Sequence, residues 1–345
     1  MVMSRRRAVF QDASIELAHG SGGKATRKLI EGLIAPYFFK EDAALTDSAT
    51  LSVGDLRLAL TADSFVVHPL RFPGGSIGEL AVNGTINDLA MGGAEPQALL
   101  VTFILEAGMD TKVLQEEIAT MAATAEKAGV AIVGGDTKVV EHGKGDGLYI
   151  TTAGLGMVHP HANLNPLSIK EGDRVILSGP IGDHGITILL ARGEIDLQAS
   201  IASDTRPLWP LVKPLFDVYG EAIRWMRDPT RGGVATALNE LARDTGLTVM
   251  LEEAAIAVRK EVRGACELLG LDPLHIANEG QFLAVVSAES AEDVLSLLHR
   301  TPGGEEARII GSLKRASRPG VLVRSDYGST RIIDMLVGDP LPRIC

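Results

Sequence analysis

Apolar, strand-like segments alternate with helix-like segments along most of this chain. In the first half the spacing predicts one helix after Ser76, which is the expected N-cap, and a longer helix after Asp110. The predicted order is strand, helix, strand, helix, strand, strand, in "LRLALTADSFVV", "SIGELAVNGTINDLAMGG", "ALLVTFILEA", "MDTKVLQEEIATMAATAEKAG", "VAIVGGD" and "GLYITTAGLGMV". This alternation indicates an α+β domain.

A segment without periodicity, "HPHANLNPLSIKEGD", separates this unit from a second one. The second unit is expected to contain helices around "ITILLARG" and "PLFDVYGEAIRWM" and strands in "RVILSGP", "LTVMLEEAAI", "FLAVVSA" and "ARIIGSLK". The predicted organisation is a glycine-rich segment (1–40), a first domain (41–158), a second domain (167–335) and a flexible tail (336–345).

Length and charge exclude several classes of protein. The 345 residues suffice for two packed cores, and no run of about 18 uncharged apolar residues is present to span a membrane. A net charge of −11 argues against nucleic acid as a partner. The opening "MVMSRRRAVF" is followed by polar residues instead of an apolar export segment, so we expect a mature, cytoplasmic N-terminus.

The chain contains two cysteines, too few for a disulfide framework. Cys266 shares helical spacing with Val262 and Leu269, so we expect a buried core thiol. Cys345 is the last residue in the sequence, where a thiol is not expected for packing. Its position calls for a chemical explanation.

The opening glycines Gly20, Gly22 and Gly23 precede Lys24 but do not form a Walker loop, because the first glycine and the Ser or Thr after the lysine are missing. Two interpretations stay open: a loop whose amides and lysine wrap phosphates, or an ordinary loop.

Several aspartates lie beside glycines or at the ends of apolar segments. Each alone fits a helix cap, a turn or a solvated position, but together they favour a metal site, because buried unpaired carboxylates are costly unless a cation compensates them. Oxygen ligands suit Mg²⁺. The residues are Asp47, Asp63, Asp88, Asp136 and Asp228.

Two further residues are candidates for catalysis, Lys138 and Glu279, although a surface role is an equal alternative for each. The histidines show no zinc spacing and no Ser-His-Asp order, and His142, His159 and His161 are expected in solvated loops.

Five segments resemble the HypE family of hydrogenase maturation proteins, within the aminoimidazole ribonucleotide synthetase (PurM-like) superfamily. The similarity extends from about His19 to Cys345, and the final "PRIC" is that family's own signature. The five segments are "HGSGGK", "TADSFVVHPLRFPGGSIGELAVNGTINDLAMGGAEP", "VGGDTKVV", "DPTRGGVATALNELA" and "ANEGQ".

The resemblance implies a two-domain PurM-like fold with a homodimer built on the first, ATP-binding domain. It also implies an activity: the carbamoyltransferase HypF loads a carbamoyl group onto the terminal cysteine, and ATP-dependent dehydration converts it to a thiocyanate. The cyanide then passes to iron on a HypC–HypD complex for [NiFe] hydrogenase. Cys345 would carry the substrate.

The resemblance and the chemistry together imply roles for individual residues. ATP and Mg²⁺ are the expected cofactors, since phosphoryl transfer depends on positioning and charge neutralisation. The tail from Gly338, with Pro340 and Pro342, can extend about 25 Å between an internal site and an outside partner. The expected catalytic residues are Cys345, Lys138 and Glu279; the nucleotide-binding residues are Gly22, Gly23, Lys24, Asp47, Asn87 and Thr137; the metal ligands are Asp63, Asp88, Asp136 and Asp228.

Two alternatives stay open. One is another enzyme of the superfamily, of the selenophosphate synthetase or thiamine monophosphate kinase type, although neither requires a terminal cysteine. The other is a non-catalytic scaffold for metal assembly that uses Cys345 as a ligand.

Overall fold

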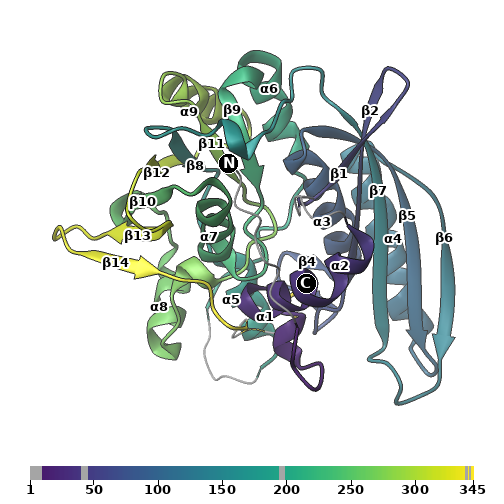
Figure 1. The fold of residues 1–345 in the computed structure, drawn as a ribbon. Coiled ribbons are helices and arrows are strands. Elements are labelled where there is room, and N and C mark those ends of the chain that lie inside the picture. The colour runs from purple at the N-terminus through teal and green to yellow at the C-terminus, as the bar shows by residue number, and fades with distance from the viewer. Residues whose placement is uncertain (1–9, 40–45, 194–198, 339–340, 342) are drawn as a thin grey trace.

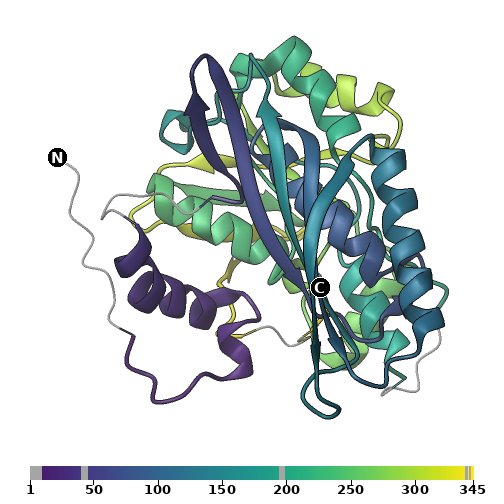
Figure 2. The same cartoon turned by 90° about the vertical axis from the view of Figure 1, so that its right-hand side faces the viewer.

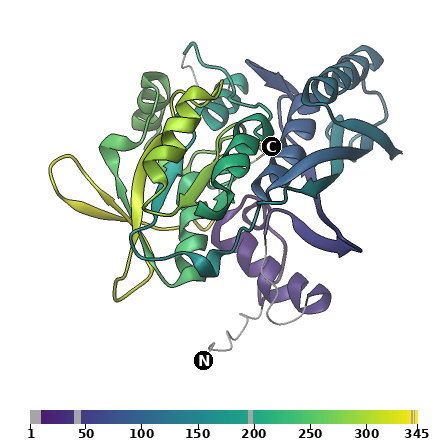
Figure 3. The same ribbon diagram turned by 90° about the horizontal axis from the view of Figure 1, so that it is seen from above.

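The computed structural model describes residues 10–39, 46–193, 199–338, 341 and 343–345, which form an α+β fold of two halves (Figure 1). Each half contains one large β-sheet, and the halves lie side by side with the C-terminus between them (Figure 3). The expectations for residues 1–9, Pro340 and Pro342 fall outside the described residues. No helix within the described ranges has the length and apolar character needed to cross a bilayer.

The sheet of the first half has five strands in the order β1-β2-β7-β5-β6. β6 is parallel to β5, whereas the other neighbours are antiparallel. Helices α3 and α4 cover one face, and in Figure 2 the strands show their other face to the viewer. The elements are β1 (Ala49–Val53), β2 (Leu56–Phe65), β5 (Ala94–Glu106), β6 (Ala131–Val140), β7 (Leu148–Val158), α3 (Ile77–Met91) and α4 (Thr111–Ala128), with the small pair β3 (Arg71–Phe72) and β4 (Gly75–Ser76).

The two predicted helix starts are confirmed. α3 begins after Ser76, although the serine side chain makes no capping bond. α4 begins after Asp110, whose carboxylate accepts a hydrogen bond from the Lys112 amide. Almost all of α3 is buried, because its faces pack against the first sheet, α4 and the second half.

The second half has a seven-stranded sheet in the order β14-β13-β10-β12-β8-β11-β9. Its side chains alternate between two cores: Val175 and Leu177 pack with α7, while Ile176 between them packs with α6 and α9. The strands are β8 (Arg174–Leu177), β9 (Ile223–Arg227), β10 (Thr248–Glu252), β11 (Leu283–Val286), β12 (Arg308–Lys314), β13 (Gly320–Arg324) and β14 (Thr330–Ile333); the helices are α5 (Asp183–Ala191), α6 (Trp209–Tyr219), α7 (Gly233–Thr245), α8 (Lys260–Leu269) and α9 (Ala291–Arg300).

One predicted element is wrong. The helix expected through "PLFDVYGEAIRWM" ends at Tyr219, and Ile223–Arg227 form strand β9. Pairing with β11 at the edge of the sheet overrides the helical pattern of the sequence. Cys266, by contrast, lies buried on α8 as predicted.

The N-terminal segment, with helices α1 (Gly23–Leu29) and α2 (Ala35–Phe38), lies against the start of the C-terminal segment. The amides of Lys24 and Ala25 donate to the carbonyls of Leu336 and Val337, at 2.9 and 3.0 Å. The Lys24 ammonium pairs with Asp334 at 2.6 Å. The glycine-rich loop therefore lies at the base of the tail.

Candidate active site

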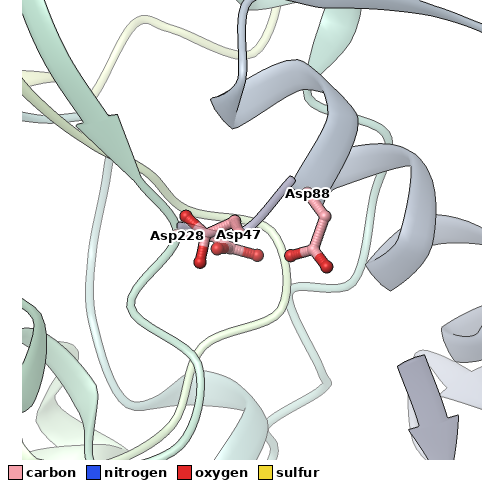
Figure 4. A group of neighbouring side chains, drawn as sticks. All are labelled: Asp47, Asp88 and Asp228. Atoms are coloured by element: carbon pink, nitrogen blue, oxygen red, sulfur yellow. The ribbon is translucent and has the colours of Figure 1, made fainter. Parts of the chain in front are cut away.

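Three carboxylates from separate elements meet where the halves join (Figure 4). Asp47 precedes β1, Asp88 lies on α3 and Asp228 follows β9, and one oxygen of each lies within 4.8 Å of the others. Three of the five aspartates predicted to act together are thus adjacent. Asp47, expected to bind nucleotide, lies among the expected metal ligands.

Burial and mutual repulsion raise the pKa values of this cluster. Burial raises the pKa of Asp47 to about 6 and that of Asp228 to about 7, and the charge of Asp47 adds to the effect at Asp228. The pKa of Asp88 is raised well above its usual value, first by burial and then by Asp228 and Asp47. An oxygen-only cluster with these raised pKa values fits Mg²⁺, whose charge favours the ionised form of every member.

These shifts predict a pH-dependent effect of Mg²⁺ on stability. Carboxyl groups whose pKa is higher in the folded than in the unfolded chain stabilise the metal-free protein below about pH 4, and this contribution is lost as the pH rises toward about 7. Mg²⁺ should therefore raise the melting temperature more at about pH 7.5 than at about pH 5. Calorimetry with Mg²⁺ or EDTA measures the difference, and equal stabilisation at both pH values would contradict it.

Arginines border the cluster. Arg227 Nε lies 2.9 Å from Asp47 Oδ1, and Arg231 Nη2 lies 3.8 Å from Asp63 Oδ1. Asp63, on β2, is adjacent to the three clustered carboxylates and its charge raises the pKa of Asp88 and Asp228. The sequence prediction assigned no role to either arginine, although Arg231 lies in the quoted "DPTRGG".

Glu279 is buried near the same carboxylates. Burial raises the pKa of Glu279 well above its usual value, and Asp228 adds to the effect, while Arg231 opposes it. Its Oε1 has no hydrogen-bond partner among the described residues. The loop around it is fixed, because the Asp204 carboxylate accepts from the Glu279 amide at 3.0 Å. Such a carboxyl group is suited to proton transfer.

The C-terminus is docked inside the protein. Ile344 and Cys345 are 2 and 8 % exposed. The Val66 amide, just after β2, donates to the Cys345 oxygen at 3.0 Å. The negative charge of Cys345 is also the largest cause that raises the pKa of Arg231. Cys345 therefore lies beside the arginine that borders the acidic cluster.

The glycine-rich loop covers that arginine. A Cβ at Gly22 would lie 3.0 Å from the Arg231 Cβ, and Gly22 has φ of +83°, so a side chain there would be strained as well as crowded. Gly23 has φ of +72° and faces the Leu336 carbonyl. These contacts explain the glycines by close backbone approach, and phosphate binding by the loop stays a prediction.

Asn87 joins the two halves. Its amide nitrogen donates to the carbonyls of Arg206 and Glu279, and its oxygen accepts from the Leu208 amide at 2.8 Å. This side chain therefore positions the loop that carries Glu279. The prediction that Asn87 binds nucleotide stays untested.

Within one chain, Asp136 and Lys138 are separated from the cluster by the first sheet, whereas Thr137 between them lies on the same face as Asp63 but on the edge strand β6. Asp63 pairs in register with the buried Thr152, whereas Asp136 pairs with Thr102 and hence lies on the opposite face of the sheet. Asp136 is exposed and forms an ion pair with Lys138. The sequence could not predict this placement, because it depends on strand register.

Comparison with known proteins supports this architecture. The model for the "AIR synthase related protein, N-terminal domain" matches residues 40–158, and the model for the C-terminal domain of the same family matches residues 170–324. Carbamoyl dehydratase HypE of Azotobacter vinelandii is 48% identical over 97% of this chain and 98% of its own length. The protein of the same name from Escherichia coli strain K12 is 44% identical over 96% of this chain and 99% of its own.

Solved structures agree. The chain is similar to a structure described as a HypE–HypF complex, with a TM-score of 0.84 and 42% identity over 89% of this chain and 99% of that one. It is also similar to a hydrogenase maturation protein HypE in complex with ATP, with a TM-score of 0.80 and 41% identity over 96% and 100% of the two chains. A thiamine monophosphate kinase of Aquifex aeolicus, at 17% identity and a TM-score of 0.62, shares the fold alone.

Proposed function

This chain belongs to the HypE carbamoyl dehydratases of the AIR synthase related family, and we propose that it converts an S-carbamoyl group on its own Cys345 to a thiocyanate with ATP. The observation that carries the proposal is the docked tail. Cys345 is buried beside Arg231, and Arg231 is in turn close enough to Asp63 and Glu279 for their charges to raise its pKa.

The reaction removes one water from S–C(=O)–NH₂. Transfer of the ATP γ-phosphoryl group to the carbamoyl oxygen turns this oxygen into a leaving group. Loss of two nitrogen protons then forms the C≡N bond as the C–O bond breaks, which yields ADP, inorganic phosphate and the thiocyanate. Glu279 is the proposed acceptor of a nitrogen proton, since burial raises the pKa of its carboxyl group and so makes the carboxylate a stronger base.

Asp47, Asp88 and Asp228, with Asp63 beside them, would hold Mg²⁺ where the two halves join. The ion would neutralise the triphosphate, which the acidic cluster otherwise repels. The ATP complex of a similar structure supports nucleotide binding in this family. Gly22, Gly23 and Lys24 are proposed to cover the phosphates, because this loop lies over Arg231.

A homodimer is proposed to complete the site. The outer face of the first sheet exposes several large apolar side chains, and Asp136 and Lys138 lie on the same face. A second copy of the chain packed on this face would shield the apolar surface and place both charged residues between the chains. We propose that Asp136 and Lys138 act there, across the interface, while the nucleotide contact of Thr137 stays a prediction. The apolar residues are Leu60, Leu100, Ile104 and Met157.

Leu100→Lys should therefore yield a monomer, because it places a charge in the centre of this face, where Leu100 is 49 % exposed in the single chain. Light scattering after size-exclusion chromatography measures the mass. Leu268→Lys on α8 is the matched control, since Leu268 is 73 % exposed on another surface. A dimeric Leu100→Lys protein would exclude this interface.

The proposed partners follow from the family. The similar HypE–HypF complex supports a carbamoyltransferase of the HypF type as the loading partner. An iron-bearing HypC–HypD complex is the proposed acceptor of the cyanide. We propose a cytoplasmic location, where reducing conditions keep Cys345 as a thiol.

Intact-mass spectrometry tests the function. After incubation with its loading partner the chain should gain one carbamoyl group, and after MgATP it should lose one water. Glu279→Gln should keep the loading step, which occurs on the partner, and slow the dehydration by about 10²-fold or more, because it removes the proton acceptor. If the loaded chain consumes no ATP and never loses water, the protein is instead a non-catalytic scaffold for metal assembly.

A further inference from the structure

His184 is a fully buried histidine on α5 to which the proposed chemistry assigns no role. Both of its ring nitrogens are hydrogen-bonded, Nε2 to the carbonyl oxygen of Ile344 at 2.7 Å and Nδ1 to the hydroxyl of Ser203 at 2.8 Å. A carbonyl oxygen can only accept, so Nε2 carries the proton. Nδ1 consequently accepts from Ser203.

The surroundings fix this arrangement. Ser203 Oγ accepts from the Thr205 amide at 3.2 Å, which directs its own hydrogen toward His184. The ring packs edge-on against Phe72, with centroids 5.7 Å apart. Burial lowers the pKa of His184 to about 4, so the imidazole is neutral at pH 7 and holds a single tautomer.

His184 also lies on the helix that is bonded to the Glu279 loop. The Asn278 side chain, next to Glu279, accepts from the Gly182 amide at 2.7 Å, and the Gly185 amide donates to the Ala277 carbonyl at 3.1 Å. The start of α5 therefore holds both the loop with the proposed base and the peptide group that precedes Cys345.

Further bonds to the main chain of the tail come from around the end of β2 and from Arg192. The amides of Val66 and His68 donate to the oxygens of Cys345 and Arg343, and Arg192 Nη2 also donates to the Arg343 oxygen. All of these contacts, like that of His184, are to the main chain. They hold the tail by its backbone, and the Arg343 side chain adds bonds to the Val66 carbonyl and to Asp146.

We propose that His184, oriented by Ser203, is a positioning residue that holds the Ile344 carbonyl and so fixes the substrate-bearing Cys345 in the active site. This inference rests on the proposed function for its catalytic consequence only. The position of the tail itself can be measured without any reaction.

The test compares His184→Leu with His184→Gln in the full chain. Leucine fills the site without a donor, whereas the glutamine amide keeps an N–H near the position of Nε2. The alkylation rate of Cys345 by N-ethylmaleimide, followed on the C-terminal peptide by mass spectrometry, reports how often the tail leaves its site. Ser203→Ala is a second variant in case His184→Leu folds poorly, since it frees the imidazole to adopt the other tautomer.

We expect His184→Leu to raise the alkylation rate by about tenfold, because the docked tail loses the stabilisation of one buried hydrogen bond. It should slow dehydration of the loaded chain by a similar factor while the loading step is unchanged. His184→Gln should restore most of the protection, and Ser203→Ala should lie between the two. His299→Leu is the matched control. His299 lies on α9, away from the tail, and its Nε2 is hydrogen-bonded to the Ala307 carbonyl at 2.8 Å.

The inference would be overturned if Cys345 were alkylated at the wild-type rate in both His184→Leu and Ser203→Ala. An equal rise of this rate in His299→Leu would overturn it as well. If even the wild-type chain forms no thiocyanate, the proposed function fails, yet the alkylation rates still decide whether His184 holds the tail.

Discussion

Cys345→Ser should lower thiocyanate formation by at least about a thousandfold. The reason is that a few per cent of a thiol is ionised at pH 7, whereas a hydroxyl is essentially never ionised. Cys345 is buried beside Arg231, at the site where the reaction is proposed to occur. The measurement is thiocyanate formed per chain after loading and MgATP.

Cys266→Ser is the control for this substitution. Cys266 is buried on α8, and burial raises the pKa of its thiol to about 11, so it is inert at neutral pH. This variant should lose some stability and keep its activity. Equal thiocyanate yields from Cys345→Ser and the wild type would show that the terminus does not carry the substrate.

Extension of the chain by two residues after Cys345 tests the same site by geometry. The Cys345 oxygen accepts from Val66 in a buried position, so additional residues would have no room in the docked state. We expect normal carbamoyl loading and little dehydration.

Asp88→Asn should remove binding of MgATP without destabilising the metal-free protein. The substitution deletes one of three clustered carboxylates. Loss of a residue that only supports a metal ligand lowers metal affinity by about 10–100-fold, so loss of a ligand should lower it further. It also removes a carboxyl group whose ionised form is disfavoured by burial and by its neighbours, so the melting temperature in EDTA should stay level or rise. Titration calorimetry and thermal unfolding measure the two effects.

Asp173→Asn provides a control with the opposite signature. Asp173 is buried and pairs with Arg224 at 2.8 Å, outside the acidic cluster. Its replacement should lower the melting temperature and leave MgATP binding intact. If Asp88→Asn instead destabilises the protein and binds MgATP normally, Asp88 is a structural residue.

Local patterns in the sequence were enough to predict much of the fold. Residues that are neighbours on a helix or strand repeat at fixed spacing, so α3, α4 and α8 could be read from the chain, together with the starts after Ser76 and Asp110. The need of buried carboxylates for a counter-charge also suggested a common role for five aspartates, of which Asp47, Asp88 and Asp228 do cluster, although neither the geometry nor the separation of Asp136 was predictable.

Contacts between distant segments were decided by the tertiary structure. Strand alternation fixes only that neighbouring residues face opposite ways; the register between β5, β6 and β7 then sets Asp136 and Lys138 on the outer face, away from Asp63. The proximity of Arg231 to Cys345 and the hydrogen bond of His184 to Ile344 also join residues that are far apart in the chain. No local preference encodes such meetings, because they arise only when the two sheets and the tail pack together and buried polar groups must find partners.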